Sequence, residues 1–407
     1  MQQQDQGQEP ALFEGLKVLD VGTWIAGPVA TTMLADYGAD VIKIEMPGVG
    51  DAYRQFALAP TSPAAEINYT WLMDARNKRS LTLNLKDPRG REILHRLVVE
   101  ADVYVTNHPL AMRRSLGLTY EDLKPLNERL VYASLTAYGE HGPERDREGF
   151  DLVAYWSRAG LMDQVRIPHA EPAQSLPGMG DHPTAVSMYA SIVTALLRRE
   201  RTGKGSLVHT SLLANGLWAA SCIAQAAFAG ADFSHWHVPG RLAPTRSLYE
   251  TSDRRWLQLT MIRTPEEFSR LLDVLGLKDL LDDPRFATPE ARLQNGTELV
   301  VRLREVIAQN TSDYWLTACR GQGVPIAMMG TLHDLLEDPQ VEANGMVESP
   351  GVDIGMTRVI RHPVNVEGAP RTPLRQAPGI GEHNGEILSA LGYSASDVQR
   401  LAHDGVI

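Results

Sequence analysis

The stretch that decides the fold is "LKVLDVGTWIAGPVATTMLADYGADVIKIE", residues 16–45. It starts with a short apolar run that ends at Gly22, as a buried strand does. A helix should follow, because Pro28 suits a first helical turn and Gly38 suits a C-terminal cap. The second apolar run, "ADVIKIE", predicts another strand. Strand, helix and strand in this order are typical of a parallel βαβ unit.

The same alternation continues downstream. The segments "RSLTLNL" (79–85), "ADVYVTN" (101–107) and "RLVYASLTAYG" (129–139) predict strands, and "DPRGREILHRLVVE" (87–100) predicts a helix between the first two. A chain that alternates in this way favours a parallel sheet covered by helices. We therefore expect an α/β fold with a large Rossmann-like domain.

Beyond residue 230 the pattern changes. The segment "SLYETSDRRWLQLT" (247–260) predicts a hairpin, and "TPEEFSRLLDVLG" (264–276) predicts a helix with Thr264 as its cap. Short strands mixed with helices indicate a smaller α+β domain. We expect four parts: the first part of the large domain (10–210), a linker helix (211–234), the small domain (235–335), and a return linker with the rest of the large domain (336–407).

Composition limits the function classes. The chain has 407 residues, a net charge of -11 and 22% charged residues, which indicates a folded, soluble protein and argues against nucleic acid as a partner. The apolar segment 217–230 is too short for a membrane span and predicts a buried helix. Cys222 and Cys319 lack metal-ligand spacing, so we expect no metal. The N-terminus resembles no signal peptide, and we expect a cytoplasmic protein.

The first strand-helix turn, "VGTWIAGP" (21–28), raises the possibility of a nicotinamide dehydrogenase. Its glycines do not form G-x-G-x-x-G, and Trp24 stands where a pyrophosphate would need close backbone approach. The dehydrogenase interpretation is therefore disfavoured. The sequence also lacks G-x-S-x-G, H-E-x-x-H and Walker A motifs.

A glycine-spaced turn followed by a long amphipathic helix, "SLPGMGDHPTAVSMYASIVTALLRRERTGKG" (175–205), contains Asp181. Pro183 suits the first turn, which makes His182 the expected N-cap and places Asp181 one residue outside the helix. There the helix dipole should keep the carboxylate ionised. The local pattern leaves two interpretations open, an acid that complements the dipole or a nucleophile.

In order along nearly the whole chain, six segments resemble the class III CoA-transferase family, also called the CaiB/BaiF or formyl-CoA transferase family. They are residues 15–54, 77–85, 117–143, 150–162, 178–205 and 379–393. The resemblance implies coenzyme A, carried by acyl-CoA substrates and by a transient enzyme thioester, and it makes Asp181 the nucleophile. Only a carboxyl side chain can hold a thiol as a thioester, which fits the transfer of CoA between carboxylic acids.

The resemblance also implies roles for other positions. Glu140 would stand near the reacting carbonyls. The expected CoA contacts are Lys78, Arg79, Asn107, His108, Arg114 and Thr136. Trp24 replaces a glutamine that orients oxalate in formyl-CoA transferase, and Arg241 is a candidate for binding the acceptor carboxylate. The motifs do not choose among donor and acceptor acids, although succinyl-CoA or a similar dicarboxylic donor is our expectation.

Two alternatives stay open. The family also contains α-methylacyl-CoA racemases, in which a histidine of "GHD" partners the aspartate; here the triplet reads "GFD" with Phe150, which favours the transferase. A non-catalytic CoA-binding paralogue is the other, and Asp181 argues against it. The resemblance further implies an interlocked homodimer, with the apolar helix at 217–230 buried in the dimer interface.

Overall fold

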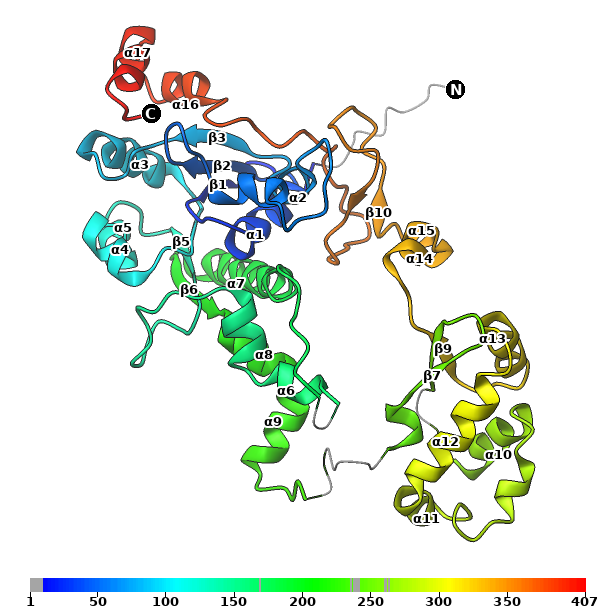
Figure 1. Cartoon of the computed structure of the whole chain (residues 1–407). Helices are drawn as coiled ribbons and strands as arrows, with labels where there is room; N and C mark the ends of the chain where they lie inside the picture. The colour runs from blue at the N-terminus through cyan, green and yellow to red at the C-terminus, as the bar shows by residue number, and fades with distance from the viewer. Residues whose placement is uncertain (1–9, 168–169, 235, 237–241, 260–261, 263) are drawn as a thin grey trace, which may run out of the picture. The chain divides into compact units, whose positions relative to one another are not determined.

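The computed structural model describes the chain in two compact units (Figure 1). The residues it describes are 10–167, 170–234, 236, 242–259, 262 and 264–407. The first unit contains the described residues up to Arg166, then Pro172–Gly230 and Asn344–Ile407. The second contains those of Ile167–Glu171 and Ala231–Ala343.

A six-stranded parallel sheet forms the centre of the first unit, in the order β3-β2-β1-β4-β5-β6. The strands are β1 (Lys17–Asp20), β2 (Asp40–Glu45), β3 (Arg79–Thr82), β4 (Val103–Thr106), β5 (Val131–Thr136) and β6 (Ser206–Ser211). The sheet confirms the predicted Rossmann-like fold. In this order the direction of winding reverses between β1 and β4, which is where such sheets bind ligands.

Helices cover both faces of this sheet. The helices of the first unit are α1 (Ala26–Ala35), α2 (Tyr69–Asp74), α3 (Pro88–Glu100), α4 (Leu110–Leu116), α5 (Tyr120–Leu123), α6 (Leu161–Val165), α7 (Asp181–Thr202), α8 (Leu212–Ala219), α9 (Ser221–Phe228), α16 (Asn384–Ala390) and α17 (Ala395–His403). Alternate strand residues point to opposite faces. Val18 packs with α1 and α7, whereas Leu19 packs with α3 and the C-terminal helices α16 and α17 (Figure 1).

The second unit has its own core around a three-stranded antiparallel sheet. Its strands are β7 (Leu248–Glu250), β8 (Trp256–Leu259) and β9 (Ile326–Met328), and its helices are α10 (Pro265–Val274), α11 (Pro289–Gln294), α12 (Gly296–Ile307), α13 (Ser312–Gly321), α14 (Leu332–Leu336) and α15 (Pro339–Ala343). The predicted hairpin is present as β7 and β8.

Two segments differ in detail from the sequence analysis. The apolar stretch expected to form one linker helix is two helices, α8 and α9, with Ala220 between them. After the second unit the chain returns to the first through a short antiparallel pair, β10 (Val347–Glu348) and β11 (Val359–Ile360). Within the described residues, no helix combines the length and the apolar character that crossing a bilayer requires.

Candidate active site

A cavity of about 350 Å³ lies where the winding of the sheet reverses. The loop after β1 contributes Thr23 and Trp24 to its wall, the loop after β4 contributes Asn107 and His108, and β5 contributes Thr136. All five follow or end strands at the carboxyl edge of the sheet. This is the position at which open α/β sheets hold their ligands.

Asp181 faces this cavity from the first turn of α7. The turn before it depends on two glycines. Gly178 has a φ of +85°, and a Cβ on Gly180 would stand 2.7 Å from the Tyr155 ring, so a side chain fits poorly at either position. The Gly180 amide donates a 3.0 Å hydrogen bond to buried Asp151. These constraints fix where the helix begins and therefore where the Asp181 carboxylate lies.

The helix begins earlier than predicted. Gly180 is the N-cap and Asp181 is the first helical residue, so the expectation of His182 as N-cap is wrong by two residues. Pro183 remains compatible with the first turn, because the amides there have no partner within the helix. The shift moves Asp181 from beside the helix into its first turn.

Burial dominates the electrostatics of Asp181. Loss of water, together with the charge of Asp151 and then of Asp74, outweighs His182 and raises the pKa of Asp181 to about 7. Among the described residues, none donates a hydrogen bond to its carboxylate. The expectation that the helix dipole keeps this group fully ionised is therefore wrong near neutral pH, where both forms are present.

His182 belongs to a polar chain beside Asp181, in which Asp74 and Tyr53 are buried and the His182 side chain is 41% exposed. Its Nε2 lies 3.3 Å from Asp74, its Nδ1 lies 3.0 Å from the Gly178 carbonyl, and the Tyr53 hydroxyl donates a 2.6 Å bond to Asp74. Although burial lowers the pKa of His182, Asp74 and the Gly178 carbonyl raise it to about 9. His182 is therefore a cation at neutral pH.

In a plot of kcat/KM against pH, we expect His182→Gln to shift the acidic limb to higher pH. His182 lowers the pKa of Asp181, so removing this cation raises it. Ionised Asp181 is then scarcer at pH 7, and the limb of kcat/KM should move up by about one pH unit. A pH profile of the variant measures this, with His141→Gln at an exposed histidine as the control. An unchanged limb would show that His182 does not act on Asp181.

Asn107 and Trp24 shape the loop that follows β1. The Asn107 side chain accepts from the Thr23 amide at 2.8 Å and donates to the Thr23 carbonyl at 2.7 Å. Trp24 has a φ of +63°, uncommon for a bulky residue, and its amide donates to Asp51 at 3.0 Å. Its ring meets Phe150 edge to face at 5.3 Å. Asn107 therefore holds this loop in place, and Trp24 forms a fixed part of the wall.

Lys78 and Arg79, both expected to contact CoA, do not line this cavity. The Lys78 ammonium is fully buried, 2.8 Å from Asp20 and 2.7 Å from the Pro28 carbonyl. Arg79 pairs with Asp40 at 2.5 Å and with Glu386 at 2.7 Å. In this structure Lys78 is an internal charge under the sheet edge, and a phosphate cannot reach it without breaking its ion pair.

The other expected site residues separate into two groups. His108 and Thr136 line the cavity, and burial with nearby Lys43 lowers the pKa of His108 to about 4, so its imidazole is neutral. Glu140 and Arg114 are absent from the lining. Glu140 is engaged by Arg113 at 3.0 Å, while Arg114 is exposed on α4. Arg241 lies outside the described residues.

Sequence reasoning missed two cations of the cavity wall. Arg145 and Arg147 both line it, next to Phe150. Arg147 stacks over Tyr138 with its guanidinium carbon 5.2 Å from the ring centre and pairs with Glu144 at 2.7 Å. The charge-rich run "PERDREGF" (143–150), which ends where a family-like segment begins, was the available signal. Among the described residues, no cluster of three or more potential metal ligands occurs.

Comparison with known proteins decides the family. Residues 13–384 match CoA-transferase family III. The chain belongs to this family. It is 30% identical to the (R)-2-hydroxy-4-methylpentanoate CoA-transferase of Clostridioides difficile, over 97% of this chain and 99% of that protein. It is 32% identical to the succinyl-CoA:glutarate CoA-transferase of Mus musculus, over 97% of this chain and 90% of that protein.

A solved structure of the same family shares the fold. The crystal structure of a CAIB/BAIF family protein from Brucella suis superposes with a TM-score of 0.80 at 30% identity, covering 94% of this chain and all of that one. The family resemblance seen in the sequence is therefore confirmed, and the chain is an enzyme of the CoA-transferase kind.

Proposed function

We propose that this family III enzyme moves CoA from an acyl-CoA donor to a small carboxylic acid through a thioester on Asp181. The observation that carries the proposal is the position of that carboxylate. It faces the cavity at the carboxyl edge of the sheet, in the first turn of α7, and none of the described residues hydrogen-bonds to it. A nucleophile must be accessible and must not be committed to another partner.

The reaction balances as an exchange of one thioester for another. The ionised Asp181 attacks the donor carbonyl, forming a mixed anhydride and releasing CoA thiolate. The thiolate attacks the aspartyl carbonyl, which frees the donor acid and leaves the aspartyl-CoA thioester. The acceptor carboxylate then opens this thioester through a second anhydride, and the returning thiolate forms the product acyl-CoA. Asp181 is regenerated, and no nucleotide triphosphate is consumed.

The surroundings of Asp181 suit this sequence of steps. A pKa of about 7 leaves the ionised form available at neutral pH, while the partly desolvated carboxylate is more reactive than one in water. Apolar groups such as Ile25, Leu135 and Leu212 line the cavity beside it and limit the access of water. Restricting water protects an anhydride and a thioester from hydrolysis.

The relatives guide the choice of substrates. Curated relatives include succinyl-CoA:glutarate CoA-transferases and a CoA-transferase of (R)-2-hydroxy-4-methylpentanoate. We propose succinyl-CoA or a similar dicarboxylic acyl-CoA as the donor and a small carboxylic acid as the acceptor. A screen of CoA donors against acceptor acids, read by mass spectrometry of the CoA esters, tests this. Absence of any transfer would contradict it.

Arg145 and Arg147 are the cavity cations suited to the phosphate groups of CoA. We expect Arg147→Gln to raise the KM for acyl-CoA by about tenfold, because a charge-assisted bond to phosphate is worth about 1.5–3 kcal/mol. The kcat should stay nearly unchanged, since the residue binds without reacting. Steady-state kinetics measure this, with Arg201→Gln at an exposed end of α7 as the control. Equal KM values in both variants would contradict the role.

The racemase alternative needs a second acid or base opposite Asp181. Phe150 occupies the cavity wall where such a histidine would stand, and its ring packs on Trp24. Asp151 is buried and accepts the amide hydrogens of Leu152 and Gly180. Exchange of the substrate α-proton with deuterated water, in the absence of an acceptor acid, would identify a racemase. We expect no such exchange.

We also propose an interlocked homodimer in the cytoplasm. Large apolar side chains on α8 and α9 support a buried partner surface: Trp218 is 79% exposed and Phe228 is 78% exposed in the single chain. A soluble protein rarely leaves such side chains together in water. Light scattering of the purified protein should give twice the mass of one chain.

A further inference from the structure

His182 follows Asp181 directly, and both nitrogens of its ring face acceptors. Nδ1 lies 3.0 Å from the Gly178 carbonyl, and Nε2 lies 3.3 Å from a carboxylate oxygen of Asp74. A neutral imidazole has a single N–H and could donate to only one of these oxygens, whereas the imidazolium donates to both. The geometry therefore favours the cation, in agreement with the raised pKa of His182.

The same histidine holds the turn that precedes α7. The Gly178 carbonyl accepts from the backbone amide of His182 at 3.1 Å as well as from the ring, so one residue occupies both lone pairs of this oxygen. Gly178 has a φ of +85°, a conformation that the rest of the chain must maintain. The ring of His182 therefore links the turn that carries Asp181 to Asp74 at the end of α2.

Asp74 is well placed to anchor this ring. Its side chain is 5% exposed, and its second carboxylate oxygen accepts the Tyr53 hydroxyl at 2.6 Å. Among the described residues, His182 is the only cation that pairs with this carboxylate. A buried carboxylate without a cation is costly, so the pair favours the charged form of His182.

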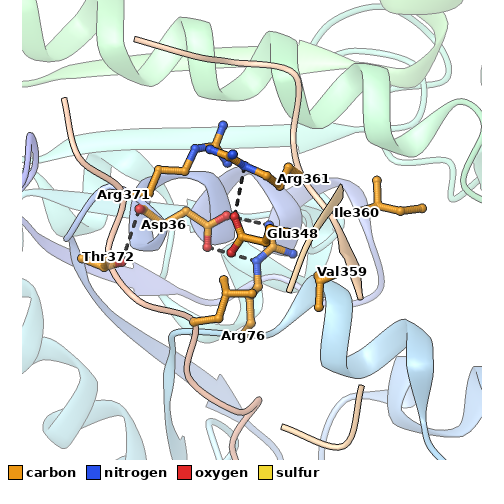
Figure 2. A pocket seen from close by; sticks show the side chains of 9 residues that line it. Asp36, Arg76, Glu348, Val359, Ile360, Arg361, Arg371 and Thr372 are labelled. Carbon is orange, nitrogen blue, oxygen red and sulfur yellow. Dashed lines mark hydrogen bonds and ion pairs between the residues drawn. The ribbon is translucent and has the colours of Figure 1, made fainter. Parts of the chain in front are cut away.

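The backbone around Asp74 is tied to α1. The Thr32 hydroxyl donates to the Asp74 carbonyl. Two residues further on, Arg76 donates to both carboxylate oxygens of Asp36, at 3.1 and 2.6 Å (Figure 2). These bonds restrict movement of the end of α2, so Asp74 can hold His182 in one place.

We propose that Asp74 is a positioning residue of the CoA-transfer site, which holds His182 so that His182 fixes the glycine turn before Asp181. This inference rests on the proposed role of Asp181. Loss of a proton from His182 removes one of its two N–H groups, so either Gly178 or Asp74 loses its bond. Activity should therefore fall as the pH rises through the pKa of His182, about 9, which gives kcat/KM an alkaline limb.

The other charged or titratable groups around His182 do not account for such a limb. They are Asp74 and Arg76 at the end of α2, Arg361 and His362 of the return segment, Asp181 on α7, and Tyr53 behind Asp74. Both arginines are paired with carboxylates (Figure 2). Burial lowers the pKa of His362 to about 4, and the pKa of Asp181 is about 7. Burial and Asp74 raise the pKa of Tyr53 far above its usual value.

Kinetics of the full-length protein test the role of Asp74. The alkaline limb near pH 9 should be absent in His182→Gln, because glutamine has no proton to lose there. At pH 8, Asp74→Asn should lower kcat by about tenfold or more and change the KM for acyl-CoA by less than about twofold. The double variant should have the kcat of His182→Gln within about twofold, because Asp74 acts through His182.

NMR of the histidine rings measures the link directly. The signal of His182, identified by its absence in His182→Gln, should titrate near pH 9 in the native protein and at least about two units lower in Asp74→Asn. Tyr53→Phe is the matched control: it removes the other partner of Asp74 but keeps the ion pair, so the ring should still titrate near pH 9.

Three results would overturn the role of Asp74: an alkaline limb that persists in His182→Gln, a native His182 that titrates near pH 6.5, or additive losses in the double variant. If Asp74→Asn does not fold, the native protein and His182→Gln still decide, because the His182 side chain is 41% exposed and its replacement should be tolerated. A covalent label on Asp181 without an alkaline limb would reject this role alone. A label on another residue would reject the proposed function.

Discussion

Asp181→Asn is expected to lower the rate of CoA transfer by at least about four orders of magnitude. An amide has nearly the shape of the carboxylate but cannot attack a thioester to form an anhydride. The affinity for CoA should change by less than about twofold, because Asp181 reacts with the acyl end and the phosphates bind elsewhere. The helix should stay folded, because the described residues form no hydrogen bond with the side chain that is lost.

Trapping supplies the direct measurement. Incubating the native enzyme with acyl-CoA and hydroxylamine should convert Asp181 to the hydroxamate, and borohydride should reduce the thioester at the same position. Mass spectrometry of the digested protein locates the label. Asp163→Asn, at an exposed acid of α6, is the matched control and should be labelled and active as the native enzyme is. Activity in Asp181→Asn, or a label on another residue, would show that the nucleophile is misassigned.

The parallel sheet followed from the sequence because its signals are local. In residues 16–45 the apolar runs, the early proline and the capping glycine all agree on one βαβ unit, and the structure has β1, α1 and β2 there. Agreement between local signals made the βαβ unit predictable. Asp181 and Asn107 were expected at the site because of the family resemblance, and the structure places both in the lining of one cavity.

Features that depend on distant contacts were not predictable. The pKa of Asp181 is raised first by burial in the folded chain and then by Asp151 and Asp74, which lie thirty and more than one hundred positions before it in the sequence. The start of α7 depends on Gly180 lying against Tyr155, which no capping pattern reveals. The sequence of a basic segment such as residues 76–79 does not show whether its side chains are exposed to solvent or buried. Only the fold shows that the buried Asp20 is the ion-pair partner of Lys78.

Lys78→Met is the second change expected to have a large effect, and the effect should be on stability. Lys78 and Asp20 are both buried, with their charged atoms 2.8 Å apart. Although burial raises it, Lys43 and Lys78 together hold the pKa of Asp20 below its usual value. Removing Lys78 leaves a buried carboxylate whose remaining partners among the described residues are the Lys43 ammonium at 3.6 Å, the Thr31 hydroxyl and the Gly22 amide. We expect a loss of about 3–5 kcal/mol in the free energy of unfolding.

Denaturant unfolding followed by circular dichroism measures this loss, with Lys86→Met at an exposed lysine as the control. The KM for acyl-CoA should stay unchanged in whatever fraction of Lys78→Met remains folded, because the ammonium does not line the cavity. A stable Lys78→Met protein with a raised KM would mean that the ion pair opens and that the lysine reaches the CoA phosphates. The two measurements therefore distinguish two roles of Lys78. If Lys78 is a buried structural charge, the substitution lowers only the free energy of unfolding. If Lys78 contacts CoA, the substitution raises only the KM for acyl-CoA.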